Sequence, residues 1–86
     1  MAKYNVLYTE AFYQSLKPIP KKDVARILRK TKALADEPRP VGSQKLSGQE
    51  RYRIRQGDYR ILYTIQEDRL IVVVVRAGHR RDVYER

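Results

Sequence analysis

Residues 51–63, RYRIRQGDYRILY, gather side chains that could bind and stabilise a phosphate. Alternate side chains of a strand point to opposite faces, so Arg51, Arg53 and Arg55 would share one face. A two-residue Gly-Asp loop with glycine first is typical of a type II′ hairpin, and it would place Arg55 opposite Arg60. Like charges that face each other destabilise a sheet. We therefore interpret the arginine row as a site for an anion such as phosphate.

The segment GHRRDVY at residues 78–84 adds side chains that can move protons. Metal-free cleavage of RNA needs a base for the 2′-hydroxyl, an acid for the leaving 5′-oxygen and cations for the charge growing on phosphorus. Arginine supplies only the last, because its very high pKa keeps it charged. His79 and Tyr84 can exchange protons. Together the two motifs indicate phosphodiester chemistry.

Each side chain of this segment also has a structural interpretation. Tyr84 could pack a C-terminal segment, since tyrosine often buries its ring and leaves its hydroxyl in water. His79 could cap the turn after the last strand. Arg81 is adjacent to Asp82, which is typical of a solvated surface, although we include Arg81 among the candidate phosphate contacts. The convergence of all these residues favours the functional interpretation.

The chain of 86 residues is expected to form one domain, residues 1–86, with a single core. Hydrophobic residues make up 42%, which is typical of a folded globule. Nineteen Lys and Arg against ten acids give a net charge of +9, which indicates a polyanionic partner. Nucleic acid is the first choice, an acidic protein the second and an anionic membrane the third. A basic but otherwise ordinary soluble protein is the alternative.

The chain has no cysteine and a single histidine. A disulfide or a thiolate metal site cannot form, and a conventional zinc site is not expected, so we expect no metal site. The apolar run at 70–75 is far shorter than the 18 or so residues that span a bilayer, and the N-terminus lacks the pattern of a signal peptide. We therefore expect a cytosolic protein with no membrane partner.

The N-terminal part predicts a strand followed by a short helix. Alternation of Tyr and Val predicts the strand over residues 3–8. Thr9 is a typical N-cap for a helix that Pro18 and Pro20 end. The apolar positions of this helix are Ala11, Phe12 and Leu16.

A second and longer amphipathic helix is expected between Pro20 and Pro38. Its apolar stripe follows the helical spacing at Val24, Ile27, Leu28, Thr31, Leu34 and Ala35. The opposite side is strongly basic and carries Lys21, Lys22, Arg26, Arg29, Lys30 and Lys32. This basic side is either a solvated surface or a contact surface for RNA or a partner protein.

Residues 39–49 are expected to form a loop, and the arginine-rich hairpin follows. The run at 70–76 is apolar up to Arg76, which is typical of a strand covered on both sides, and we place it centrally. The predicted fold is α+β, in the order β-α-α-β-β-β. Two helices from the N-terminal half pack on one face of a small, mostly antiparallel four-stranded sheet. The arginine row then lies on the other, concave face.

The sequence RYRIRQGDYRILYTI, then an apolar strand, then GHRRDVY resembles the RelE branch of the RelE/ParE superfamily of type II toxins. The resemblance covers nearly the whole chain. It implies an α+β fold and cleavage of messenger RNA in the A site of the small ribosomal subunit, with no cofactor. It also implies a cognate antitoxin, with an acidic or amphipathic segment that wraps the helix from Lys21 to Lys32 and covers the cleft or displaces the Tyr84 tail.

The resemblance also implies roles for individual residues. Arg53 and Arg55 stand where the prototype toxin has basic, largely lysine, side chains near the reacting nucleotide. Arg60 matches the transition-state arginine of the family, Arg80 a second phosphate-binding arginine, and Tyr84 the tyrosine proposed as general base. Arginine at both 53 and 55 is a poor proton donor, which leaves His79 as the candidate general acid.

Two other functions compete with mRNA cleavage. A ParE-like inhibitor of DNA gyrase would share the basic hairpin without nuclease chemistry. A non-catalytic RNA-binding module would use the arginine row only to follow the backbone, with a salt slope of about −0.7 per neutralised phosphate on single strands. His79, Tyr84 and the paired Arg53 and Arg55 favour the RelE-like nuclease.

Overall fold

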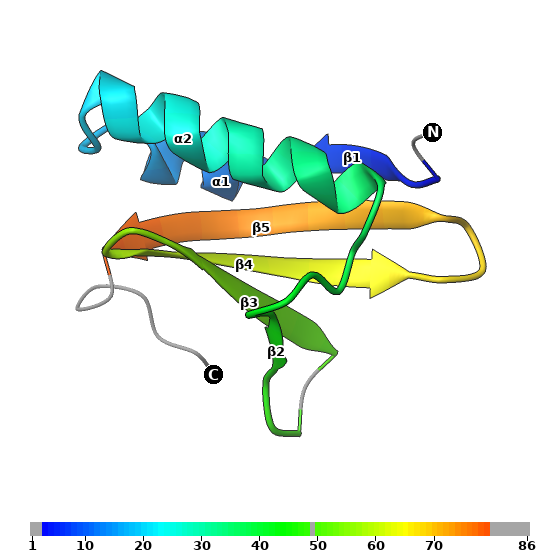
Figure 1. The fold of residues 1–86 in the computed structure, drawn as a ribbon. Helices are drawn as coiled ribbons and strands as arrows, with labels where there is room; N and C mark the ends of the chain where they lie inside the picture. Colours follow the sequence, from blue (N-terminus) through cyan, green and yellow to red (C-terminus); the bar gives the residue numbers. More distant parts are fainter. Residues whose placement is uncertain (1–2, 49, 80–86) are drawn as a thin grey trace.

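The computed structural model describes residues 3–48 and 50–79, in which two helices lie on one face of a five-stranded sheet (Figure 1). The strand order is β1-β5-β4-β3-β2, with β1 parallel to β5 and the other neighbours antiparallel. The strands are β1 (Asn5–Tyr8), β2 (Gln44–Lys45), β3 (Arg51–Gln56), β4 (Tyr59–Gln66) and β5 (Ile71–His79). The predicted α+β class and element order are confirmed.

The expected sheet of four strands has a fifth, β2, inside the segment expected to be a loop. This strand has only two residues, which is too short for a periodic pattern to reveal it. It pairs with β3 through Gln44 and Lys45, and the Leu46 amide donates to the Arg51 carbonyl at 2.8 Å. The side chain of Leu46 packs on Leu62. The fifth strand therefore extends the sheet beyond β3, the strand that carries three of the arginines.

The short helix α1 (Glu10–Ser15) begins where the sequence predicts, at Thr9. The Thr9 hydroxyl accepts a hydrogen bond from the Phe12 amide at 3.0 Å and donates to the Val75 carbonyl at 2.6 Å. Such a cap satisfies a backbone donor that the first helical turn leaves open. The same hydroxyl therefore starts the helix and fixes it to β5.

The long helix α2 (Lys21–Lys32) continues into a 3₁₀ turn, η1 (Ala33–Ala35), and carries the predicted apolar stripe. Ile27, Thr31 and Leu34 are fully buried against the sheet. The buried Thr31 hydroxyl donates to the Leu28 carbonyl and is 2.9 Å from the Tyr8 hydroxyl, so this polar group is satisfied. No helix within residues 3–48 and 50–79 is long and apolar enough to cross a membrane.

The core lies between the helices and one face of the sheet. The fully buried strand residues are Ile54, Ile61, Tyr63, Val72 and Val74, and they pack with Phe12, Ile27 and Leu34 of the helical layer. Each large aliphatic side chain buried in this way contributes about 1.5–3 kcal/mol. Ile54 and Ile61 pair across β3 and β4 and therefore share this buried face.

The strand β5 lies inside the sheet, between β1 and β4, but only one of its faces is fully covered. Val72 and Val74 are completely buried, whereas Val73 and Val75 are half-buried on the face without helices. The expectation of cover on both sides was wrong because both helices pack on the same face (Figure 1). A run of β-branched residues does not distinguish these cases.

Candidate phosphate site

The β3–β4 hairpin has the register that the sequence predicts. Arg55 pairs with Arg60, and Arg53 pairs with Leu62. Gly57 has a φ of +60°, whereas Asp58 keeps a negative φ, as a type II′ turn requires. Glycine takes this conformation without a steric cost. The turn thus holds two arginines from neighbouring strands side by side.

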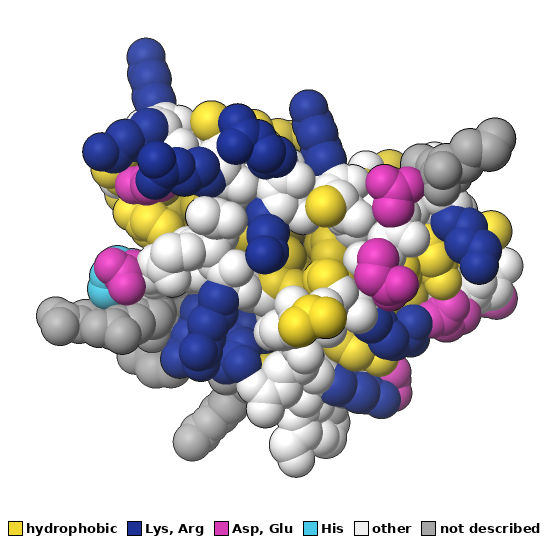
Figure 2. All heavy atoms as spheres, in the orientation of Figure 1, with side chains coloured by type: hydrophobic (Ala, Val, Ile, Leu, Met, Phe, Trp, Pro, Cys, Tyr) yellow, Lys and Arg dark blue, Asp and Glu magenta, His cyan; other side chains and the backbone are white. Residues whose placement is uncertain are grey.

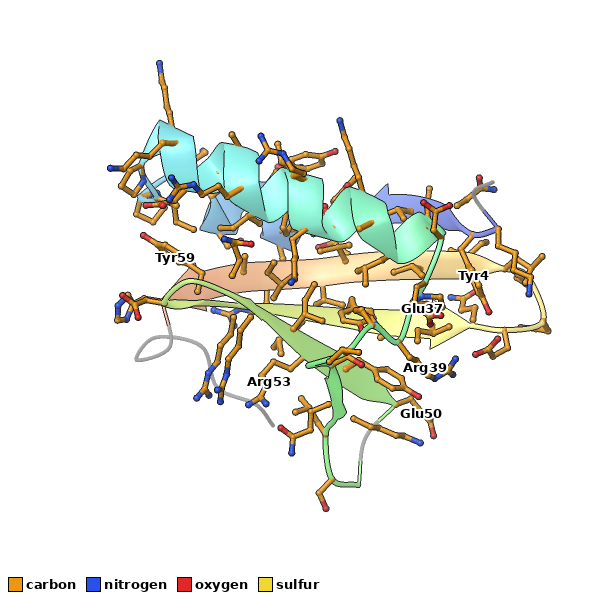
Figure 3. All side chains as sticks on the ribbon, in the orientation of Figure 1. Tyr4, Glu37, Arg39, Glu50, Arg53 and Tyr59 are labelled. Carbon is orange, nitrogen blue, oxygen red and sulfur yellow. The ribbon has the colours of Figure 1, made fainter. Side chains whose placement is uncertain are left out.

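The arginine row lies on the face of the sheet that the helices do not cover. Figure 3 shows Arg53 pointing away from the helical layer. Arg53 is 9% exposed and its guanidinium donates to the Gln44 side chain of β2. Arg51 and Arg60 are half-buried, and Arg55 is exposed. In Figure 2, Lys and Arg side chains gather below the hairpin as a group separate from those over α2.

Arg55 and Arg60 open into a common pocket of about 130 Å³ at the end of the hairpin. Gly57, Asp58 and Tyr59 complete its lining. Two guanidinium groups on neighbouring strands can each present paired N–H donors to one phosphate. The pocket therefore suits an anion with several acceptor oxygens.

A β-bulge in β5 determines which residues flank these arginines. The register shifts between Leu62 and Tyr63, so that Leu62 pairs with Arg76 and Arg60 pairs with Gly78. The bulge assigns the exposed Arg76 to the arginine face, next to Leu62. Gly78 leaves the position across from Arg60 without a side chain. No pattern in the sequence locates this bulge.

His79 lies elsewhere than the sequence suggested. It is the final residue of β5 rather than part of a tail beyond it, and it pairs with Tyr59. Their rings meet edge to face, with centroids 5.9 Å apart at 85°. Because Tyr59 is on the opposite side of β4 from Arg60, the register separates His79 from the arginine row. A role for His79 beside the reacting phosphate therefore lacks support from this register.

The predicted site residues Arg80, Arg81 and Tyr84 lie outside the described residues, and their roles stay predictions. Among the described residues, no three histidine or carboxylate side chains are grouped as metal ligands would be.

The basic side of α2 divides into two parts. Lys21, Lys22 and Lys32 are exposed on the helix surface. Arg26, Arg29 and Lys30 line a groove of about 360 Å³ between the helix and the end of β3, together with Ala33 and Gln56. The second part therefore borders the sheet, as a contact surface would, whereas the first part is a solvated surface.

A group of polar side chains at the other end of the molecule was not predicted. Glu67 accepts a hydrogen bond from the Tyr4 hydroxyl at 2.7 Å and forms an ion pair with Arg39 at 2.5 Å. The Arg39 guanidinium also lies over the Tyr52 ring, 5.3 Å from its centroid. The hydrogen bond from Tyr4, and then that from Arg39, lower the pKa of the Glu67 carboxyl. We call Tyr4, Arg39, Tyr52 and Glu67 the strap cluster.

The strap cluster fixes the connection between η1 and β2. Arg39 belongs to this connection, and the Tyr63 hydroxyl donates to the Pro38 carbonyl beside it at 2.7 Å. Burial raises the pKa of Tyr63 to about 12, which keeps this donor protonated. The same connection leads to Gln44, which holds Arg53. These contacts join residues far apart in sequence, so no local signal reveals them.

Three comparisons place the chain among known proteins. Residues 6–84 match the family model of the ParE toxin of the type II toxin-antitoxin system parDE. Toxin RelG of Mycobacterium tuberculosis is 32% identical over 87 residues, which cover 96% of this chain and 98% of the relative.

Solved structures agree with this result. The RelBE2 toxin-antitoxin complex of Mycobacterium tuberculosis contains a chain with a TM-score of 0.80 and 26% identity, covering 90% of this chain and 98% of that one. The archaeal RelE-RelB complex of Pyrococcus horikoshii gives 0.81 and 26%, covering 94% and 99%. The free mutant RelE of E. coli, at 18% identity and a TM-score of 0.76, shares the fold, covering 92% of this chain and 84% of that one.

Proposed function

Because the chain belongs to the RelE/ParE superfamily of type II toxins, we propose that it is a ribosome-dependent endoribonuclease that cleaves messenger RNA in the A site and inhibits translation. One observation carries this proposal. Arg55 and Arg60 face each other across the hairpin and open into one pocket, on the side of the sheet away from the helices. A facing pair of like charges is costly unless an anion lies between them.

The proposed reaction is attack of a 2′-hydroxyl on the neighbouring phosphorus. The 2′-oxygen bonds to phosphorus, the bond to the leaving 5′-oxygen breaks, and a cyclic phosphate and a 5′-hydroxyl result. Tyr84 takes the proton from the 2′-hydroxyl, as the resemblance to RelE implies. Arg60 and Arg80 stabilise the charge on phosphorus, and preorganised donors of this kind commonly contribute about 3–4 kcal/mol each.

His79 stays the candidate general acid that protonates the leaving oxygen. Its pairing with Tyr59 separates it from Arg60, so this role needs a test of its own. A His79→Gln variant with unchanged ribosome-dependent cleavage would remove the assignment. A variant whose pH–rate profile loses the fall at high pH that a general acid causes would support it.

The proposed partners are a cognate antitoxin, the small ribosomal subunit and messenger RNA, which would place the activity in the cytoplasm. The solved relatives include complexes with RelB antitoxins. An acidic or amphipathic segment of an antitoxin would complement the groove lined by Arg26, Arg29 and Lys30 and the net charge of +9. Binding there would extend over the end of β3 and cover the arginine face.

A second candidate is inhibition of DNA gyrase without nuclease activity. The specific observation in its favour is that the matching family model is that of the ParE toxin. The basic face would then bind an acidic protein surface rather than RNA.

Primer extension on a defined messenger RNA distinguishes the two candidates. Purified protein is incubated with the message alone, or with ribosomes that carry it with an empty A site, and Tyr84→Phe is run in parallel. We expect discrete cuts at the A-site codon only with ribosomes, and their loss in the variant. Intact message from folded protein, together with inhibition of gyrase supercoiling, would replace the proposal by the second candidate.

A further inference from the structure

A second pocket lies at the tip of the β3–β4 hairpin, between the sheet and the first turns of α2. Its volume is about 400 Å³, within the range of about 300–1,000 Å³ that is common for small-ligand sites. Its lining residues are Asp23, Arg26, Gln56, Gly57, Asp58, Tyr59 and His79. Most of them are absent from the arginine site described above.

The two pockets meet at the turn. Gly57, Asp58 and Tyr59 line both this pocket and the smaller one formed by Arg55 and Arg60. Figure 3 shows Tyr59 rising from the end of the hairpin toward the start of α2. A ligand that crosses the turn would therefore place one group between the arginines and the next group beside Tyr59.

The chemistry of the second pocket differs from that of the first. Tyr59 and His79 meet edge to face and form an aromatic wall. Two carboxylates, Asp23 and Asp58, also line it, and one of them pairs with Arg26 at 3.8 Å. Asp58 also lines the arginine pocket, but the second pocket adds Asp23 and lacks Arg55 and Arg60, so repulsion disfavours a second phosphate here. The pocket therefore suits a neutral, flat and polar group.

An unpaired nucleobase has this chemistry. Proteins recognise single-stranded RNA by stacking its bases on aromatic rings and by bonding their polar edges to amide and carboxylate groups. Tyr59 supplies the ring, while Gln56 and Asp58 supply the hydrogen-bonding groups. An acidic peptide, the other ligand that a basic protein attracts, would meet two carboxylates here.

We propose that the hairpin tip holds a nucleobase adjacent to the phosphate bound by Arg55 and Arg60, with Tyr59 stacking on it and Gln56 and Asp58 bonding its edge. The inference rests on the proposed function, since it assumes a bound RNA strand. In this arrangement the hairpin turn aligns the RNA strand, and Gln56 and Asp58 select the base.

Nuclear magnetic resonance of the full-length, isotope-labelled protein tests this inference without any cleavage step. The probes are inorganic phosphate and four RNA trinucleotides that differ in the central base and carry hydrogen in place of the reactive 2′-hydroxyl. We expect phosphate to shift only signals of the arginine pocket, which include those of the shared residues 57–59. The trinucleotides should also shift the amide of Gln56 and the ring of His79, which line only the second pocket, to a degree that depends on the base.

Variants of Tyr59 and Gln56 sharpen the test. Tyr59→Leu should weaken trinucleotide binding roughly 5- to 150-fold, as expected for a lost stacking ring. Tyr59→Phe keeps the ring and should bind like the wild type, which controls for folding. Gln56→Ala should reduce the difference between bases while phosphate binding is unchanged.

Trinucleotides that shift only the signals moved by phosphate, or none, would overturn the inference. If the wild-type protein does not cleave messenger RNA on ribosomes but its signals still shift in a base-dependent way, the proposed function is refuted and the base site is supported. The two failures are therefore distinguishable.

Discussion

Charged side chains are arranged differently at the two ends of the sheet. In the strap cluster, Glu67 is paired with Arg39 and accepts a hydrogen bond from Tyr4. At the hairpin end, Arg55 faces Arg60 directly. Paired opposite charges suit a structural role, whereas facing like charges lower stability and suit a site that binds an anion. The contrast indicates which end is built for stability and which for function.

The largest effect should come from removing Arg60 at the hairpin end. Arg60→Ala should lower the rate of ribosome-dependent cleavage about 10²–10³-fold, because one preorganised cation of the transition state is lost. Arg60→Lys should recover only part of the rate, since an ammonium lacks the paired donors of a guanidinium. Single-turnover cleavage on programmed ribosomes measures both.

Arg69→Ala is a matched control for this prediction. Arg69 is exposed and belongs to the turn between β4 and β5, at the strap end and away from the β3–β4 hairpin turn. Its loss changes the net charge by the same amount as the loss of Arg60. Equal rate losses in both variants would attribute the effect to net charge rather than to position.

The next effect concerns the stability of the strap end. Tyr63→Phe should lower the free energy of unfolding by about 1–3 kcal/mol, because the buried Pro38 carbonyl loses its donor. Urea unfolding followed by circular dichroism measures this change. Unchanged stability would show that the bond to Pro38 does not hold the connection to β2.

The raised pKa of Tyr63 adds a pH dependence to this comparison. Its folded pKa of about 12 exceeds the usual value near 10, so its contribution is complete below about pH 10 and is lost as the pH rises toward 12. Wild type should therefore lose stability in this window more steeply than Tyr63→Phe. An equal dependence of the free energy of unfolding on pH in the two proteins would show that Tyr63 is not the titrating group.

A smaller effect is expected at the hairpin turn itself. Gly57→Ala should cost about 1–2 kcal/mol, since φ is +60° and a Cβ there meets no atom within 4 Å. The cost is therefore backbone strain alone. Asp58→Ala, at a position with ordinary φ, serves as the control in the same unfolding experiment.

The smallest effect concerns the exposed ion pair of the strap cluster. Because the folded pKa of Glu67 is lowered, its contribution to stability is present at neutral pH and is lost as the pH falls below about 4. The difference in the free energy of unfolding between wild type and Glu67→Gln should therefore be smaller at low pH than at neutral pH. Urea midpoints at pH 7 and pH 3 test this, and an equal difference at both would contradict it.

The sequence predicted the parts of this molecule that depend on local pattern. Alternation and the Gly-Asp turn determined the pairing of Arg55 with Arg60, and Thr9 marked the start of α1. Such features depend on neighbours within a few residues, which periodicity and turn chemistry report directly.

The remaining features depend on contacts between distant residues. The bulge that pairs Arg60 with Gly78 arises from the fit of two whole strands, and it also determines the side on which His79 lies. The strap cluster joins Tyr4 to Glu67 across most of the chain. Neither the bulge nor the strap cluster leaves a periodic or compositional signal, so neither could be predicted from the sequence.

The most direct test of the account measures cleavage and stability on the same Arg60→Gln variant. This substitution removes one of two facing charges and keeps a shorter but still polar side chain. We expect single-turnover cleavage on ribosomes to fall about 10²–10³-fold and the urea midpoint not to fall. A cleavage rate equal to that of the wild type, or a rate loss that follows a lowered midpoint, would contradict it.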